Sequence, residues 1–321
     1  MKKILFASTA LVATAGMAAA ELTWSGSGRL GLVYEEGAAE ETRVDHRFRL
    51  TVNGVTETDS GVKFEGRIRW QADDGYARGV EEQGGVLVDA APSTNGAGST
   101  GGAGAAGFAV STGGFRLDVG HVSDVFDSGD VVNWGGYGVG YTGFLDQAAN
   151  FAGFNKTGFG NTGVRQQTIK ARYTAGDFTG AISYTLDGTD WDGSDLEDNW
   201  QIGAGYSFGA HKVGAMYGDA TAAGKQWAIG ADGAFGDFSY AALIGDNDSA
   251  DDLMWGLSGS YSVSAAGTIT GFVSGGGAAA NDTSYGIGYA HSLGGGVTLA
   301  AGIGSDESGT TVADAGVKFN F

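Results

Sequence analysis

The sequence predicts an all-β fold, a 16-stranded antiparallel transmembrane β-barrel with an inward-folded third loop. Three observations predict it. Segments of about ten residues alternate between bulky apolar and small or polar side chains, as in strands with one lipid face and one aqueous face. Short turns separate these segments at regular spacing. The chain has 61 glycines and one proline, and it lacks an apolar run of about eighteen residues that could span a membrane as a helix.

The first element is a predicted secretory signal over residues 1–20. Two lysines open it, an apolar stretch follows, and three alanines at its end supply a small-residue cleavage site. An anchoring helix is the alternative, but the apolar stretch is short, includes Ala, Thr and Ser, and has no basic flank after it. We therefore expect export, and a mature barrel over residues 21–321.

The mature chain is strongly acidic. Without the two lysines of the signal, 16 of the 18 basic residues remain against 37 acidic residues, a net charge of −21. This charge argues against nucleic acid as a partner and suits a surface that meets cations. Cysteine is absent, so no disulfide framework stabilises the exported protein.

Alternation is clearest over residues 253–263, where Trp255 and Leu257 share one face and Gly256 and Ser258 the other. It recurs over residues 199–208 and in a closing strand over residues 310–321. A soluble sandwich gives the same period, normally with its bulky side chains directed inward. Here the opposite face carries mostly Gly, Ser, Asn and Gln, which suits a water-filled lumen.

Seven short turns fix the strand count. Seven turns on one side separate eight hairpins, so sixteen strands follow, with both chain termini of the barrel on the short-turn side. The last strand must then pair with residues 22–35, which leaves no unpaired edge in the membrane. The turns lie at Thr58–Gly61, Gly113–Phe115, Gly176–Phe178, Gly209–His211, Gly236–Phe238, Ser264–Gly267 and Gly294–Gly296.

Two connections are much longer than the rest. Residues 73–107 contain a low-complexity stretch rich in Gly and Ala, which we interpret as a long external loop. Residues 122–163 carry several aromatic side chains, which argues for order. A barrel of sixteen strands encloses an aqueous channel, so we expect this second connection to fold inward as a constriction loop.

With these elements placed, the chain resembles the general porins of alphaproteobacteria, the Rhodobacter type. The resembling stretches are ELTWSGSGRLGLVYE, RFRLTVNGVTETDSGVKFEGRIR, GGFRLDVGHVSDVF and the ending TTVADAGVKFNF. The resemblance implies a homotrimer in the outer membrane that passes small hydrophilic solutes and ions by passive diffusion. It also implies that Phe321 is part of the signal read by the barrel-assembly machinery. The implied partners are therefore other copies of the chain, outer-membrane lipids, that machinery, and small polar solutes and ions.

Charged side chains on the predicted lumen face are the candidate functional residues. The first three strands place six arginines on that face, and the expected constriction loop carries four aspartates. Opposite charges across the narrowest point would create a transverse field that sets selectivity. The alternative is that they are ordinary solvated lumen charges. The basic wall consists of Arg29, Arg43, Arg47, Arg49, Arg67 and Arg69, and the acids are Asp124, Asp127, Asp130 and Asp146.

Signals for an enzyme or a cofactor are weak. Residues 26–31 match the GxGxxG pattern, but they lie within a predicted strand and no helix follows to bind a pyrophosphate. The acidic runs at residues 187–192 and 246–248 offer oxygen ligands for Ca²⁺, with exposed solvated loops as the alternative. We expect neither a cofactor nor a catalytic residue. The four histidines are scattered, and we interpret them as interface or turn residues: His46, His121, His211 and His291.

A passive diffusion pore is therefore the leading function. A substrate-specific channel is one alternative, because a binding track would use the same lumen arginines and aromatic side chains. A non-conducting surface or adhesive barrel, whose long loops bind a partner, is another.

Overall fold

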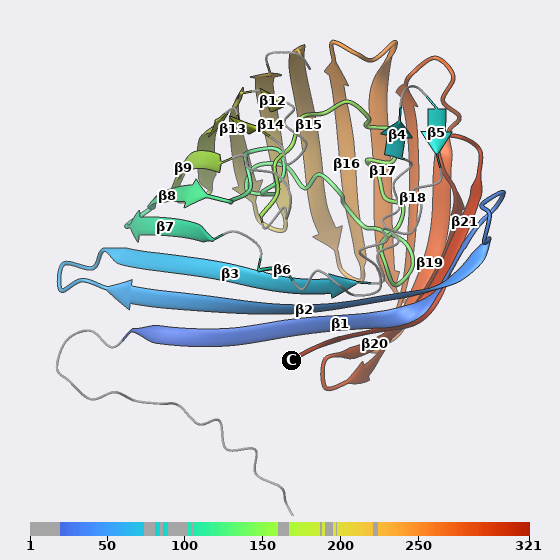
Figure 1. Ribbon diagram of the computed structural model, residues 1–321, viewed down its shortest axis with the longest axis horizontal. Coiled ribbons are helices and arrows are strands. Elements are labelled where there is room, and N and C mark those ends of the chain that lie inside the picture. Colours follow the sequence, from blue (N-terminus) through green and yellow to red (C-terminus); the bar gives the residue numbers. More distant parts are fainter. Residues whose placement is uncertain are drawn as a thin grey trace, which may run out of the picture.

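The alternating segments form long antiparallel strands that follow one another around a closed barrel (Figure 1). The computed structural model describes residues 20–73, 81–83, 86–88, 102–103, 106–159, 167–186, 188–189, 195–196, 198–220 and 224–321. Within these residues, sixteen strands make the wall: β1 (Glu21–Glu35), β2 (Thr42–Glu57), β3 (Lys63–Asp73), β7 (Gly107–Thr112), β8 (Phe115–Gly120), β9 (Gln167–Ala175), β10 (Phe178–Leu186), β13 (Asn199–Phe208), β14 (His211–Ala220), β15 (Gly224–Phe235), β16 (Phe238–Asn247), β17 (Asp252–Ser262), β18 (Gly267–Gly277), β19 (Ser284–Gly294), β20 (Val297–Ser305) and β21 (Thr311–Asn320).

Each wall strand pairs antiparallel with the strands before and after it. The sheet counts 17 strands because the short β6 (Gly102–Ala103) also pairs with β3, in line with β7. Two further pairs lie outside the wall: β4 (Glu81–Gln83) with β5 (Val86–Val88), and β11 (Gly188–Thr189) with β12 (Asp195–Leu196). The sixteen-stranded antiparallel barrel is thereby confirmed.

The closing strand pairs with the first strand, as predicted. The ladder runs from Ser27 opposite Asn320 to Glu35 opposite Val312. Beyond it, the Phe321 amide donates to the Gly26 carbonyl at 3.0 Å, and the Gly26 amide donates to the Phe321 carbonyl at 2.8 Å. A Cβ at Gly26 would lie 2.3 Å from the Phe321 ring. The first glycine of the GxGxxG pattern therefore leaves room for the Phe321 ring in its observed position.

All seven predicted short turns connect consecutive wall strands. These seven turns lie at one end of the barrel, and the first strand begins and the last strand ends at that same end. The hairpin count that predicted sixteen strands is therefore correct.

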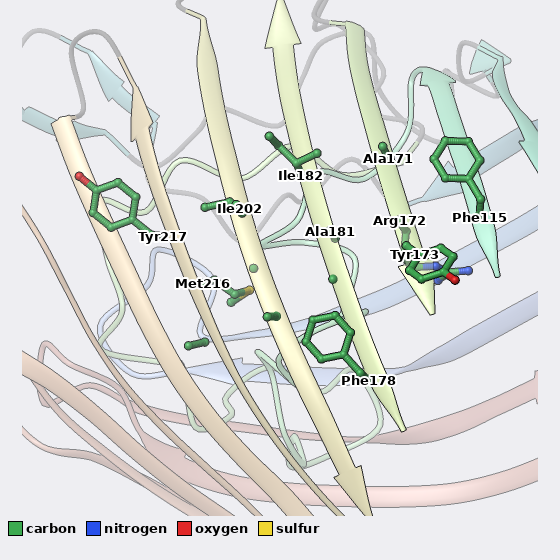
Figure 2. A pocket seen from close by; sticks show the side chains of 14 residues that line it. Phe115, Ala171, Arg172, Tyr173, Phe178, Ala181, Ile182, Ile202, Met216 and Tyr217 are labelled. Carbon is green, nitrogen blue, oxygen red and sulfur yellow. The ribbon is translucent and has the colours of Figure 1, made fainter. Parts of the chain in front are cut away.

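The outer face of the wall is apolar. On β13, the exposed side chains include Trp200, Ile202 and Tyr206, whereas Gln201 is fully buried on the opposite face. Figure 2 shows Phe178, Ile182, Ile202 and Tyr217 projecting around a shallow apolar groove of about 640 Å³ over the small residues of β10, β13 and β14. A soluble sandwich would turn these side chains inward, so an apolar surrounding is required instead. Among the described residues, no helix has the length and apolarity needed to cross a membrane.

Three predicted boundaries fall partly outside the described residues. Residues 1–19 of the predicted signal lie outside them. Most of the predicted external loop, residues 73–107, also lies outside them, as do residues 160–163 of the predicted constriction loop. Those boundaries stay predictions.

Candidate functional site

The connection between β8 and β9 contributes an ordered core of its own. We call its described part, residues 121–159, the β8–β9 segment. Its aromatic rings pack edge to face, with centroids 4.8 Å apart for Trp134 and Phe154 and 5.7 Å apart for Trp134 and Phe126. Together with Phe151, these rings contact a buried cluster that includes Met216 and Met254 of the wall. Burial of large aromatic surfaces dominates core energetics, so apolar packing stabilises this segment against β14–β17.

Polar side chains of the wall bind the backbone of this segment. The alternation pattern predicts that the small and polar face lines water. On six strands side chains of this face instead bind the irregular segment, whose backbone amides need acceptors. The donor and acceptor pairs are Val125 N to Ser183 Oγ at 3.2 Å, Phe126 N to Gln201 Oε1 at 2.9 Å, Asn155 N to Gln226 Oε1 at 2.7 Å, Tyr137 N to Ser258 Oγ at 2.9 Å, Asn150 N to Ser274 Oγ at 3.2 Å and Tyr141 N to Asp314 Oδ1 at 3.0 Å.

Glycines on β19 and β20 allow the closest approach. A Cβ at Gly302 would lie 2.5 Å from the Gly140 nitrogen, and one at Gly288 would lie 2.9 Å from the same atom. Both distances are too short for a real contact. The segment therefore rests directly on the backbone of these two strands.

Tyr141 extends the contacts to the first two strands. Its hydroxyl donates to Asp45 Oδ1 at 2.8 Å, and Asp45 also pairs with Arg29 at 2.9 Å. Burial and the hydrogen bond to Asp45 raise the pKa of the Tyr141 phenol well above its usual value. The phenol is therefore a neutral donor at any physiological pH.

The six arginines of the predicted basic wall lie on three adjacent strands. Arg29 and Arg47 are opposite each other in the β1–β2 ladder. The guanidinium carbons of Arg67 and Arg69 lie 3.5 Å and 4.7 Å from the ring centroid of Phe159, at the end of the β8–β9 segment. On the wall, Arg29 pairs with Asp45, Arg43 pairs with Glu35 at 2.9 Å, and Arg49 donates a hydrogen bond to Gln71.

Asp124 is fully buried within the β8–β9 segment. Its Oδ1 accepts a hydrogen bond from Asp127 N at 2.8 Å, and its Oδ2 accepts from Thr157 N at 2.6 Å and Gln201 Nε2 at 2.8 Å. Burial raises the pKa of Asp124 to about 6, although these three hydrogen bonds oppose the shift. The carboxyl joins the two ends of the segment to β13.

The other three predicted acids have different surroundings. Asp127 is exposed, and its negative charge acts on Arg69 of the basic wall. Asp130 pairs with Lys170 at 2.7 Å and with Arg172. Burial alone would raise the pKa of Asp130, but these two cations hold it below its usual value. Asp146 accepts a hydrogen bond from the Ala148 amide at 2.7 Å, and burial raises its pKa.

Three cations on β8 and β9 were not among the predicted site residues: Arg116, Lys170 and Arg172. Their signal was present, since Arg116 and Asp118 alternate with apolar residues on one strand, as Lys170 and Arg172 do on the next. The ladder places Arg116 opposite Arg172 and Asp118 opposite Lys170. These strands therefore carry a second charged cluster beside the predicted basic wall.

A metal site has little support in the described part of the chain, where no group of three or more His, Cys, Asp or Glu side chains could hold an ion. The acidic run at residues 187–192 has no described side chain. In the run at residues 246–248, Asp248 accepts a hydrogen bond from the Lys225 amide at 2.9 Å, as part of the loop structure.

His211 packs among aromatic rings on the outer face, 4.6 Å from the Phe235 centroid.

Comparison with known proteins decides the family. A sequence model of the Gram-negative porin family matches residues 7–311. The chain belongs to the Gram-negative porin family. It is 29% identical over 319 residues to a porin of Fuscovulum blasticum, covering 94% of this chain and 100% of that one. Two solved mutants of the Rhodopseudomonas blastica porin superpose with a TM-score of 0.72 at 26% and 27% identity, each covering 94% of this chain and 100% of the mutant.

This porin is accordingly an outer-membrane diffusion channel of a Gram-negative bacterium and not an enzyme. The resemblance to alphaproteobacterial porins is confirmed. The family also accounts for the apolar outer face, because a porin barrel meets lipid where a soluble barrel meets water.

Proposed function

We propose that this porin is a passive, water-filled channel for small hydrophilic solutes and ions, and that residues 122–163 form its constriction loop. The observation that supports the loop's role is the reach of the β8–β9 segment. It binds Gln201 of β13 at one part of the closed wall, and Asp314 of β21 and Asp45 of β2 at another. A segment that bridges distant strands on their polar face has to cross the space that these strands enclose.

We propose that the basic wall lines the constriction on the side across from the loop. Arg67 and Arg69 face the segment through Phe159, and Asp127 is the exposed acid near them. We propose that Asp127 and these arginines set the transverse field. Asp124 and Asp146 have a different proposed role: Asp124 binds amides of the segment and Gln201 of β13, and Asp146 binds an amide of the segment.

The proposed assembly is a homotrimer, with outer-membrane lipids against the remaining apolar surface. We also propose that the predicted signal directs export of the chain and that the barrel-assembly machinery recognises Phe321. The ring of Phe321 stacks on Phe48 at a centroid distance of 5.5 Å on the outer face. That position at the end of the last strand suits recognition before the barrel closes. The negative net charge favours cations as the preferred ions.

Single-channel recording of the purified protein in planar bilayers tests this proposal. We expect large, weakly selective steps that close in three levels, and a reversal potential of cation-selective sign in a salt gradient. Current that saturates with one solute would favour a substrate-specific channel. Absence of conductance in correctly folded barrels would favour a non-conducting surface protein. Single-level closure would contradict the trimer.

A further inference from the structure

A small polar cavity of about 270 Å³ lies between β3, β8, β9 and the start of the β8–β9 segment. We propose that it binds a small oxyanion of the phosphate type. Six charged residues line it: the cations Arg67, Arg116, Lys170 and Arg172, and the acids Asp118 and Asp130. The proposal deepens the proposed function and rests on it, because solutes reach the cavity only if the lumen is open to them.

The charge balance of the cavity favours an anion. Four cations face two carboxylates in its lining. Arg116 also pairs with Glu65, which lies outside the lining, at 2.9 Å. Even with that third acid the local charge stays positive, in a chain whose net charge is −19. The cavity is therefore locally positive, whereas the chain as a whole is negative.

Arg67 is the proposed primary donor. Its side chain is exposed, and its guanidinium lies against the Phe159 ring at 3.5 Å from the centroid. With the described residues it forms no ion pair and no hydrogen bond. A guanidinium has five N–H donors in a planar fork that matches two oxygens of a phosphate or carboxylate. Stacking on an aromatic face leaves that edge available for an oxyanion.

The other cations are held in place before any anion arrives. Asp130 binds Lys170 and Arg172 from the segment, and Asp118 binds the Arg116 Nε at 2.9 Å. These pairs fix the long side chains, so little further conformational entropy is lost on binding. Each cation keeps donors beyond those its carboxylate uses. The Ser123 hydroxyl accepts a hydrogen bond from Phe159 N at 3.3 Å, which leaves its own proton for a ligand.

The cavity extends along β8. Arg116 follows the turn at Gly113–Gly114 by two residues, whereas Val122 and Ser123 lie beyond the other end of the strand at Gly120. A bound anion would thus sit beside the start of the β8–β9 segment. It would place negative charge next to the basic wall and reduce anion flow there.

Direct binding to the full-length barrel in detergent at low salt is the first test, with inorganic phosphate as the probe and titration calorimetry as the readout. Wild type is expected to bind phosphate saturably. Arg67→Gln should weaken binding by about tenfold or more, since a hydrogen bond to a charged group contributes strongly. Arg67→Lys keeps the charge but loses the fork, so it should also bind more weakly. Lys318→Gln is the control, because it removes an exposed cation of β21 that does not line the cavity.

Absence of saturable binding to wild type would overturn the inference, as would an equal loss of affinity in Arg67→Gln and Lys318→Gln. The second result would assign the effect to net charge and not to the cavity. Recording in bilayers, with phosphate replacing chloride at constant ionic strength, keeps the two proposals apart. If the barrel conducts but phosphate does not bind, the proposed site is wrong and the channel function stands. If phosphate binds but the barrel does not conduct, only the proposed channel function is wrong.

Discussion

Replacement of Asp314 by alanine should release the middle of the β8–β9 segment while the barrel stays intact. Asp314 lies on β21 and is only 5% exposed. It accepts hydrogen bonds from Tyr141 N at 3.0 Å and from Thr142 N at 2.9 Å, and a third from the Thr142 hydroxyl. In the alanine variant these donors lose their common acceptor. The ladder of β21 is formed by backbone groups, so it is unaffected.

The expected magnitude follows from the two backbone hydrogen bonds. Each bond to a charged acceptor contributes about 1.5–3 kcal/mol. Water that enters the space left by the carboxylate would satisfy part of the loss, so we expect a cost of about 3 kcal/mol to the attached state. That value raises the ratio of detached to attached segment by about a hundredfold. The aromatic cluster of Trp134 with Phe126, Phe151 and Phe154 still holds the parts of the segment on either side of Tyr141 and Thr142.

Three measurements together check this expectation. Single-channel current should become larger and noisier in Asp314→Ala, amides near Tyr141 should lose protection from hydrogen exchange, and the melting temperature of the barrel should stay close to wild type. Lys318→Ala, an exposed position on the same strand, should change none of them. Unchanged current and unchanged protection would refute the reasoning. A large fall in melting temperature would refute the claim that segment and barrel are stabilised separately.

Three further predictions address other contacts. The pKa of Asp124 is raised to about 6 from an ordinary value of 3.8, so at a pH between these two values the attached segment holds a proton that the detached segment lacks. The attached state should therefore lose up to about 3 kcal/mol of stability as pH rises from about 4 to 6. Hydrogen exchange of segment amides should show this pH dependence in wild type, and an equal pH dependence in Asp124→Asn would contradict the assignment. Gly302→Ala should push the segment away from β20, because the new Cβ would lie 2.5 Å from the Gly140 nitrogen; conductance should rise, whereas Gly54→Ala, with no neighbour nearer than 3.9 Å, should match wild type. Deletion of Phe321 should lower the yield of inserted barrels in an assembly assay, with normal conductance in those that insert; normal yield would argue against the terminal residue as a signal.

The strands and turns were predictable because their signals are local. Period-2 alternation placed the two faces of β13 and β17, and turns such as Gly176–Asp177 marked where one strand ends and the next begins. Antiparallel hairpins pair neighbours in sequence, so the order of the strands required little more than counting. The pairing of β21 with β1 then followed from the need to leave no open edge in a membrane.

The sequence by itself determined the barrel, its two faces and the presence of a long aromatic connection after β8. Only the tertiary structure decided which polar side chains of the wall meet water and which bind that connection. Gln201 and Asp314 have the same alternation signal as any inward polar residue, and their partners lie 75 and 173 positions away. The same holds for the acids: Asp124 is buried and Asp127 exposed, three positions apart. Such contacts depend on the path of an irregular segment, which has no period from which the sequence could predict it.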